Sequence, residues 1–186
     1  MALRNIFVEG DEILGKKCKK VSEVNDRVRE QLDDMLETMR DQMGVGIAAP
    51  QVGLLKRMCV IEPEEDKVIF LINPEVVGKK GEQEGYEGCL SVPGLIGKVK
   101  RPLSIKVNAL DRDGVMQQYT FTDFEAVVAS HEIDHLDGIL YTSKATDIHE
   151  PQPGEMADPS EEEYEDESEE GSVDTEETVT EETVAE

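Results

Sequence analysis

Residues 131–135 of the chain read His-Glu-Ile-Asp-His, and they lie inside a stretch, residues 124–137, whose pattern is that of a helix. Two histidines four residues apart lie on the same face of a helix, so both imidazoles can reach one metal ion. Glu132 then lies beside them as a candidate base. The same spacing also arises on polar helices whose histidines only face solvent, so the surrounding sequence has to decide between the two interpretations.

Both ends of this helix are marked in the sequence. Thr122 and Glu125 have the spacing of a capping box, and Gly138 is a stop signal just past the last turn. Together these signals predict a helix of about fourteen residues.

The histidines are predicted to face the interior. Val127, His131 and His135 follow one another at four-residue steps, which places them on one stripe of the helix. A site with two histidines needs at least one more protein ligand, and a cysteine thiolate suits a divalent transition metal. Cys89 is the candidate, because glycine and proline interrupt its segment and predict a loop rather than a long strand. Its alternative interpretation is a small buried residue.

The charge of the chain is concentrated at its end. The net charge is -24, and residues 149–186 hold 17 acidic residues and no Lys or Arg. Residues 1–148 contain the other 26 acidic residues together with all 19 basic residues. We therefore expect a mildly acidic globular domain over residues 1–148 and an acidic, low-complexity, disordered tail over residues 149–186.

The cellular setting follows from what the sequence lacks. Three cysteines without a spacing motif argue against a disulfide framework and for a reducing compartment. Neither a signal peptide nor a run of eighteen apolar residues is present, which predicts a cytoplasmic protein outside the membrane. Direct nucleic-acid binding is not expected, because basic runs and aromatic-rich strands are absent.

The remaining elements predict an α+β fold. Two pairs of β-branched runs, 58–61 with 68–72 and 104–110 with 117–121, predict hairpins. We expect these mostly antiparallel sheets to pack around a central metal-binding helix, the histidine helix. An N-terminal amphipathic helix over 26–43 is predicted to end at Gly44 and to bury a stripe of Val28, Leu32, Met35, Leu36, Met39 and Met43.

Residues 44–53 form an unusual connection, since they are small and apolar with a single amide, that of Gln51. Two glycines here allow close approach of the backbone. The sequence predicts a buried tight turn in which Gln51 hydrogen-bonds to nearby backbone.

Three separated blocks together resemble the motifs of the peptide deformylase family. They are Gly-Val-Gly-Ile-Ala-Ala-Pro-Gln at 44–51, Glu-Gly-Cys-Leu-Ser at 87–91 and His-Glu-Ile-Asp-His at 131–135. Enzymes of this family remove the formyl group from the N-terminal formyl-methionine of new polypeptides. The resemblance runs from about residue 6 to about residue 141, and it implies N-formylmethionyl peptides or nascent chains as substrates.

The resemblance also implies a metal centre. Cys89, His131 and His135 would be the three protein ligands, which leaves a fourth coordination position open, as catalytic sites require. The metal in this family is usually Fe(II), with Zn, Ni or Co also able to occupy the site. The donor atoms by themselves indicate only a divalent transition metal.

Further roles are carried over from the resemblance alone. Glu132 would move the proton of the attacking water to the departing amine. The Gln51 side-chain amide and the Leu90 backbone N–H would stabilise the negative charge that grows on the formyl oxygen. Substrate-binding roles, including an apolar pocket for the methionine side chain, are implied for Val45, Gly46 and Val127.

The sequence departs from the family pattern in three places. Ser130 precedes the first histidine where glutamine is common, and Gly15 stands where an arginine is frequent. The acidic tail does not suit a phosphate-rich surface. We therefore carry over no ribosome contact to the tail, and the sequence does not identify a partner for it.

Two other functions share parts of this pattern. A zinc peptidase would use the same helix and base, but such enzymes usually take their third ligand downstream of the histidines, whereas Cys89 lies 42 residues upstream of the first one. A catalytically silent deformylase-like protein, acting as a binding module through its acidic tail, is the second alternative.

Overall fold

The computed structural model of the protein describes residues 2–152, and the predicted tail lies outside these residues from position 153 onward. The helical elements are η1 (Glu12–Gly15), α1 (Asp26–Asp41), η2 (Ala49–Val52), α2 (Asp123–Leu136) and η3 (Tyr141–Ser143). The strands are β1 (Gly46–Ala48), β2 (Met58–Ile61), β3 (Ile69–Lys80), β4 (Gln83–Cys89), β5 (Val92–Arg101), β6 (Ser104–Leu110), β7 (Met116–Thr122) and β8 (Thr146–His149).

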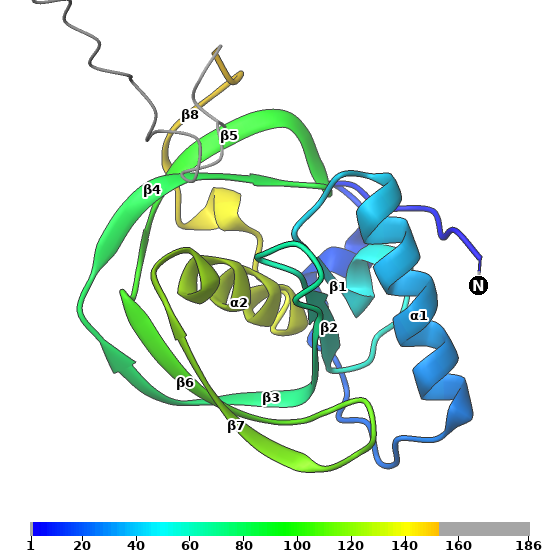
Figure 1. Cartoon of the computed structure of the whole chain (residues 1–186). Coiled ribbons are helices and arrows are strands. Elements are labelled where there is room, and N and C mark those ends of the chain that lie inside the picture. The colour runs from blue at the N-terminus through cyan, green and yellow to red at the C-terminus, as the bar shows by residue number, and fades with distance from the viewer. Residues whose placement is uncertain (1, 153–186) are drawn as a thin grey trace, which may run out of the picture. The chain divides into compact units, whose positions relative to one another are not determined.

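The strands form two antiparallel sheets. One has the order β1-β2-β3-β6-β7 and the other the order β4-β5-β8. In Figure 1, α2 runs between the β3-β6-β7 layer and the β4-β5 hairpin, and it contacts β1, β2, β6 and β7 of the larger sheet and β5 of the smaller. The predicted mixture of helices with mostly antiparallel sheets is confirmed.

Both predicted hairpins are confirmed. β2 pairs with β3 from Met58 opposite Ile72, and β6 pairs with β7 from Ser104 opposite Thr122. β3 continues through Pro74 to Lys80 and is therefore longer than the predicted run of 68–72. The register shifts between Ile72 and Glu75, so the proline, which has no N–H to donate, lies at an irregularity of the ladder.

α1 packs an apolar face on β1 and β2. Asn25 caps the helix by accepting a hydrogen bond from the Val28 N–H, as a good N-cap residue does. The buried apolar side chains of the helix are Val28, Leu32, Met35 and Met39, and they join a core cluster with Ile47, Met58 and Val60.

The predicted end of this helix was wrong. α1 stops at Asp41 rather than Met43, and the left-handed residue after it is Met43, with φ of 54°, instead of Gly44. The Met43 side chain is 93% exposed and lies outside the buried stripe. The N–H of Gly44 still bonds back to the Met39 carbonyl, which closes the helix end.

α2 has the predicted length of 14 residues but not the predicted cap. Thr122 is the N-cap residue, yet its side chain makes no capping hydrogen bond. Glu125 instead pairs with Lys67 in the turn between β2 and β3. The helix start is therefore held by an ion pair to a neighbouring turn, which the local sequence pattern does not reveal.

The segment around Cys89 is extended, contrary to the loop predicted for it. Cys89 is the last residue of β4 and pairs with Val92 across a tight turn. The register of β4 shifts between Gly88 and Cys89. Gly88 therefore marks a bulge within the β4-β5 hairpin and does not end the strand.

The smaller sheet extends past the predicted domain boundary at 148/149. β8 runs from Thr146 to His149 and pairs with β5 through Ile96 and Lys98. Within residues 2–152, no helix combines the length and the apolar character needed to cross a membrane.

Candidate active site

The three predicted metal ligands come together from two elements. Cys89 ends β4, while His131 and His135 lie one turn apart on α2. The Cys89 Sγ lies 3.3 Å from the His135 Nε2, which lies 3.2 Å from the His131 Nε2. All three ligand atoms lie within 4.8 Å of one another.

These distances fit a metal centre. Donor atoms around a tetrahedral ion, at about 2.0–2.1 Å for nitrogen and 2.3 Å for sulfur, lie roughly 3.3–3.6 Å from one another. One thiol sulfur and two imidazole nitrogens are donors that a divalent transition metal accepts. The residues present can therefore hold a divalent transition metal ion.

The orientation of His131 is set by Glu87, which no sequence pattern had assigned a role. The Glu87 Oε2 lies 2.8 Å from the His131 Nδ1. A proton held at Nδ1 by this contact leaves the Nε2 lone pair directed at the other two ligand atoms. The ring of His131 also stacks on Tyr141, with 6.0 Å between the ring centroids.

The second histidine is kept neutral. Burial holds the pKa of His135 well below its ordinary value. A neutral imidazole has the lone pair that metal coordination needs. The buried Nδ1 of His135 has no hydrogen-bond partner among the described residues.

Glu132 has the environment of a proton carrier. Its side chain is 4% exposed, and its Oε2 has no hydrogen-bond partner among residues 2–152. Burial raises the pKa of Glu132 to about 7. A carboxyl group that titrates near neutrality can both accept and return a proton.

Gly46 makes room for this carboxyl group. A Cβ added at Gly46 would lie 2.5 Å from the Glu132 Oε1 and 2.9 Å from its Cδ. Only glycine therefore allows β1 to lie this close to the base. The sequence had assigned Gly46 to substrate binding, and its place beside Glu132 is a further constraint.

Gln51 points its side-chain N–H groups toward Cys89. Its Oε1 accepts a hydrogen bond from the Ala48 N–H at 2.7 Å, which confirms the predicted contact with nearby backbone. Its Nε2 consequently faces the Cys89 Sγ at 3.6 Å and the Ser91 hydroxyl at 3.2 Å. The amide is fixed as a donor at the edge of the metal site.

The other predicted residues lie around this centre. Leu90 directly follows Cys89, and its side chain lies 3.0 Å from where a Cβ on Gly44 would be. Val45 precedes Gly46 with 42% of its side chain exposed, and Val127 is half-buried on α2 one turn before His131. Val45 is thus open to solvent beside the site.

Sequence reasoning missed the charged residues behind the ligands. Arg101, at the end of β5, donates to Glu87 and to Asp134 of α2. Burial alone would raise the pKa of Glu87, but the hydrogen bonds from Arg101 and His131 lower it to about 2. The signal would have been an arginine at the end of β5, had the pairing of β4 with β5 been recognised.

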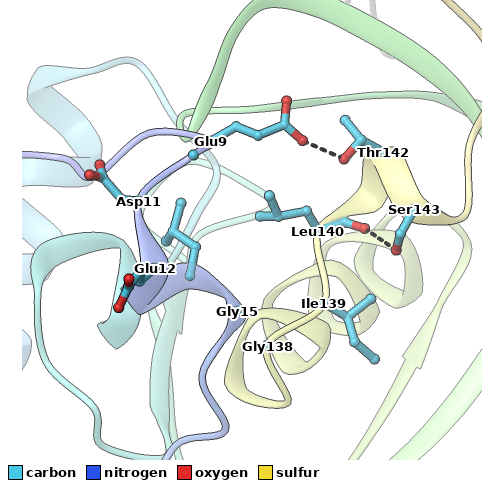
Figure 2. A pocket seen from close by; sticks show the side chains of 11 residues that line it. Glu9, Asp11, Glu12, Gly15, Gly138, Ile139, Leu140, Thr142 and Ser143 are labelled. Atoms are coloured by element: carbon cyan, nitrogen blue, oxygen red, sulfur yellow. Dashed lines mark hydrogen bonds between the residues drawn. The ribbon is translucent and has the colours of Figure 1, made fainter.

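A pocket of about 410 Å³ lies between the turn around η1 and the segment after α2 (Figure 2), apart from the cluster of Cys89, His131 and His135. Glu9, Asp11 and Glu12 line one side of it, and Glu9 accepts a hydrogen bond from the Thr142 hydroxyl. Gly15, where the family often has an arginine, lines it too. None of the proposed catalytic residues or metal ligands does.

Comparison with known proteins identifies the family. Residues 3–150 match the family model described as polypeptide deformylase. The chain belongs to the polypeptide deformylase family. It is 53% identical over 144 residues to the peptide deformylase of Acetivibrio thermocellus, which covers 77% of this chain and 84% of that protein.

Solved structures of deformylases have the same fold. The structure of a peptide deformylase from Legionella pneumophila matches with a TM-score of 0.76 at 39% identity, covering 78% of this chain and 88% of that one. The peptide deformylase from Synechococcus elongatus in complex with actinonin matches with a TM-score of 0.75 at 35% identity, covering 77% and 79%. The deformylase described here is thus a hydrolase that removes the N-terminal formyl group of polypeptides.

Proposed function

We propose that Cys89, His131 and His135 hold a single divalent transition metal, Fe(II) in the cell, at which formyl-methionine is hydrolysed to formate and a free amine. The observation that carries this proposal is the convergence of one sulfur and two nitrogen atoms within 4.8 Å beside a buried carboxyl group. Zn, Ni or Co would satisfy the same donors.

When bound, the metal would act as a Lewis acid that lowers the pKa of a water molecule and polarises the formyl carbonyl group. Glu132 accepts the proton of the attacking water and delivers it to the nitrogen of the departing amine. Its raised pKa suits both transfers. The formyl C–N bond breaks, and the products are formate and a polypeptide with a free N-terminus.

The growing negative charge on the formyl oxygen needs donors that are already oriented. Gln51 meets this need, because the Ala48 N–H holds its oxygen and leaves its Nε2 facing the site. The Leu90 backbone N–H is the second donor in this proposal. Both groups come from segments that flank the ligands, so no large movement is required.

The substrate is a formyl-methionyl peptide or a nascent chain. Its methionine side chain would lie among apolar groups near Val45 and Val127, and its backbone would run along Gly46. Polarisable thioethers fill such apolar spaces well. Because the substrate is a newly made polypeptide, we place the activity in the cytoplasm.

A formate-release assay tests this function. The full chain, purified without oxygen and analysed for metal, should release formate from formyl-Met-Ala in proportion to its Fe(II) content. Met-Ala without the formyl group should give no product. Cleavage of an internal peptide bond without formate would favour the zinc peptidase, and a fully metallated but inactive protein would favour the binding module.

A further inference from the structure

Arg101 is a buried cation behind the proposed metal site. It is the last residue of β5, and only 4% of it is exposed. Its Nε and Nη2 donate to the two oxygens of Glu87 at 2.7 and 2.8 Å, while its Nη1 donates to the Asp134 Oδ2 at 2.5 Å. The guanidinium group thus holds two carboxylates through one planar fork.

Each of these carboxylates is tied to a proposed metal ligand. The same Glu87 oxygen that accepts from Arg101 contacts the Nδ1 of His131, so the direction of the imidazole depends on where Arg101 holds Glu87. Asp134 lies on α2 between the two histidines in sequence, and Lys144 contacts the same Asp134 oxygen as Arg101, at 2.6 Å.

The same contacts connect the two elements that carry the ligands. Glu87 lies on β4 two residues before Cys89, and Asp134 lies on α2 one residue before His135. Arg101 therefore joins the strand that supplies the sulfur to the helix that supplies both nitrogens. Side chains that support metal ligands in this way orient them and tune the affinity for the metal.

We infer that Arg101 is a positioning residue of the metal centre, which fixes the orientation of His131 and the spacing between Cys89 and the histidine helix. This inference rests on the proposed ligand set. A purely structural ion pair would be a weak reason to bury both Arg101 and Glu87, since desolvation offsets much of their attraction. Fixing ligand geometry gives the network a specific role.

The test replaces Arg101 by lysine and measures Co(II) binding. Lysine keeps the positive charge but cannot hold two carboxylates in a planar fork. Arg57→Lys is the matched control, because Arg57 also pairs with a carboxylate at α2, that of Asp137, at 2.8 Å but makes no contact with Glu87 or a ligand. The readouts are the Co(II) dissociation constant from chelator competition, the ligand-field spectrum and the thermal midpoint.

Arg101→Lys is expected to weaken Co(II) binding about 10- to 100-fold and to change the ligand-field spectrum. Arg57→Lys should keep the wild-type affinity and spectrum, even if its thermal midpoint falls. Asp134→Asn leaves the Arg101–Glu87 contacts in place and should weaken Co(II) binding less. If Arg101→Lys does not fold, the Co(II) affinity and spectrum of Asp134→Asn decide whether Arg101 positions the metal centre.

Wild-type Co(II) affinity and spectrum in the folded variants would overturn the inference. A fall in the thermal midpoint alone, with unchanged metal binding, would do the same, because it would leave Arg101 a structural role only. Cys89→Ala separates this outcome from failure of the ligand set. If that variant kept the wild-type Co(II) spectrum, the proposed ligands would be wrong whatever the Arg101 variants did.

Discussion

Glu132 combines burial, a pKa near neutrality and a place on α2 between the two proposed metal ligands, His131 and His135. Replacement by glutamine preserves its shape but removes its capacity to carry a proton. We expect Glu132→Gln to bind metal as the wild type does and to lower kcat by about 10²- to 10⁴-fold, the usual contribution of a general base. Formate release and metal content measured on the same sample check this.

Glu125→Gln is the matched control for that experiment. Glu125 lies on the same helix, but it pairs with Lys67 and not with the site. Its replacement should leave kcat unchanged. Similar turnover in Glu132→Gln and in this control would remove Glu132 from the proton-transfer role.

Among the secondary-structure elements, β1 contacts α2, and its Gly46 lies beside Glu132. Alanine there would place a methyl carbon 2.5 Å from the Glu132 Oε1, so the base must move. Because misplacement of a catalytic group by about 1 Å can cost roughly 10²-fold in rate, we expect a loss of that order in kcat for Gly46→Ala, with metal content retained.

Gly85→Ala serves as the control, since Gly85 also lies in a strand and an added Cβ there meets nothing within 4 Å. It should retain wild-type kcat. The explanation through Glu132 fails if Gly46→Ala is as active as Gly85→Ala.

The N-terminal segment is attached to α1 through Asp34. Partial burial alone would raise the pKa of Asp34, but hydrogen bonds from the Ala2 N–H and from Arg4 lower it below its ordinary 3.8. A lowered carboxyl pKa stabilises the fold above the unfolded-state pKa, and this stabilisation is lost as the pH falls through the folded-state pKa.

Asp34→Asn should therefore be less stable than the wild type at pH 7 and equally stable once the pH is well below 3.8. Urea unfolding of both proteins at several pH values measures the difference. A stability gap that persisted unchanged in acid would mean that the charge of Asp34 is not its source.

For the molecule as a whole, the position of a truncation should decide its effect. The contacts described above for α2, the ligands and β8 all lie within residues 2–152. Ending the chain after Gln152 should preserve both the thermal midpoint and formate release. Ending it after Ala145 removes β8, which pairs with the strand that carries Arg101, and should lower the thermal midpoint.

A large loss of activity on ending the chain at Gln152 would show that residues 153–186 take part in the reaction or the fold. Equal stability of the two truncated proteins would show that β8 adds little to the smaller sheet. Circular dichroism melts and the formate assay distinguish these results.

Much of this molecule could be predicted from local patterns. The two hairpins and the length of α2 follow from side-chain periodicity and turn residues, which act over a few positions. The meeting of Cys89 with the histidines was a candidate from the ligand chemistry alone, and the resemblance of three blocks to one family then implied it. Each block alone was ambiguous.

What could not be predicted depends on pairing between distant segments. Glu87 and Arg101 are 14 residues apart and meet only because β4 and β5 pair in one register. The capping box predicted for α2 does not form, and Glu125 instead pairs with Lys67, 58 residues away in the sequence. Met43 was assigned to the core because its periodicity fits, although the helix ends before it.

Gly46 also limits how this enzyme can escape an inhibitor. A compound that binds the main chain of Gly46 contacts atoms that no substitution removes. Any side chain introduced at this position would displace Glu132. Resistance by substitution at Gly46 would therefore cost the activity it is meant to protect. Val45, exposed and one residue away, carries no such constraint, so compounds that depend on its side chain are the more easily evaded.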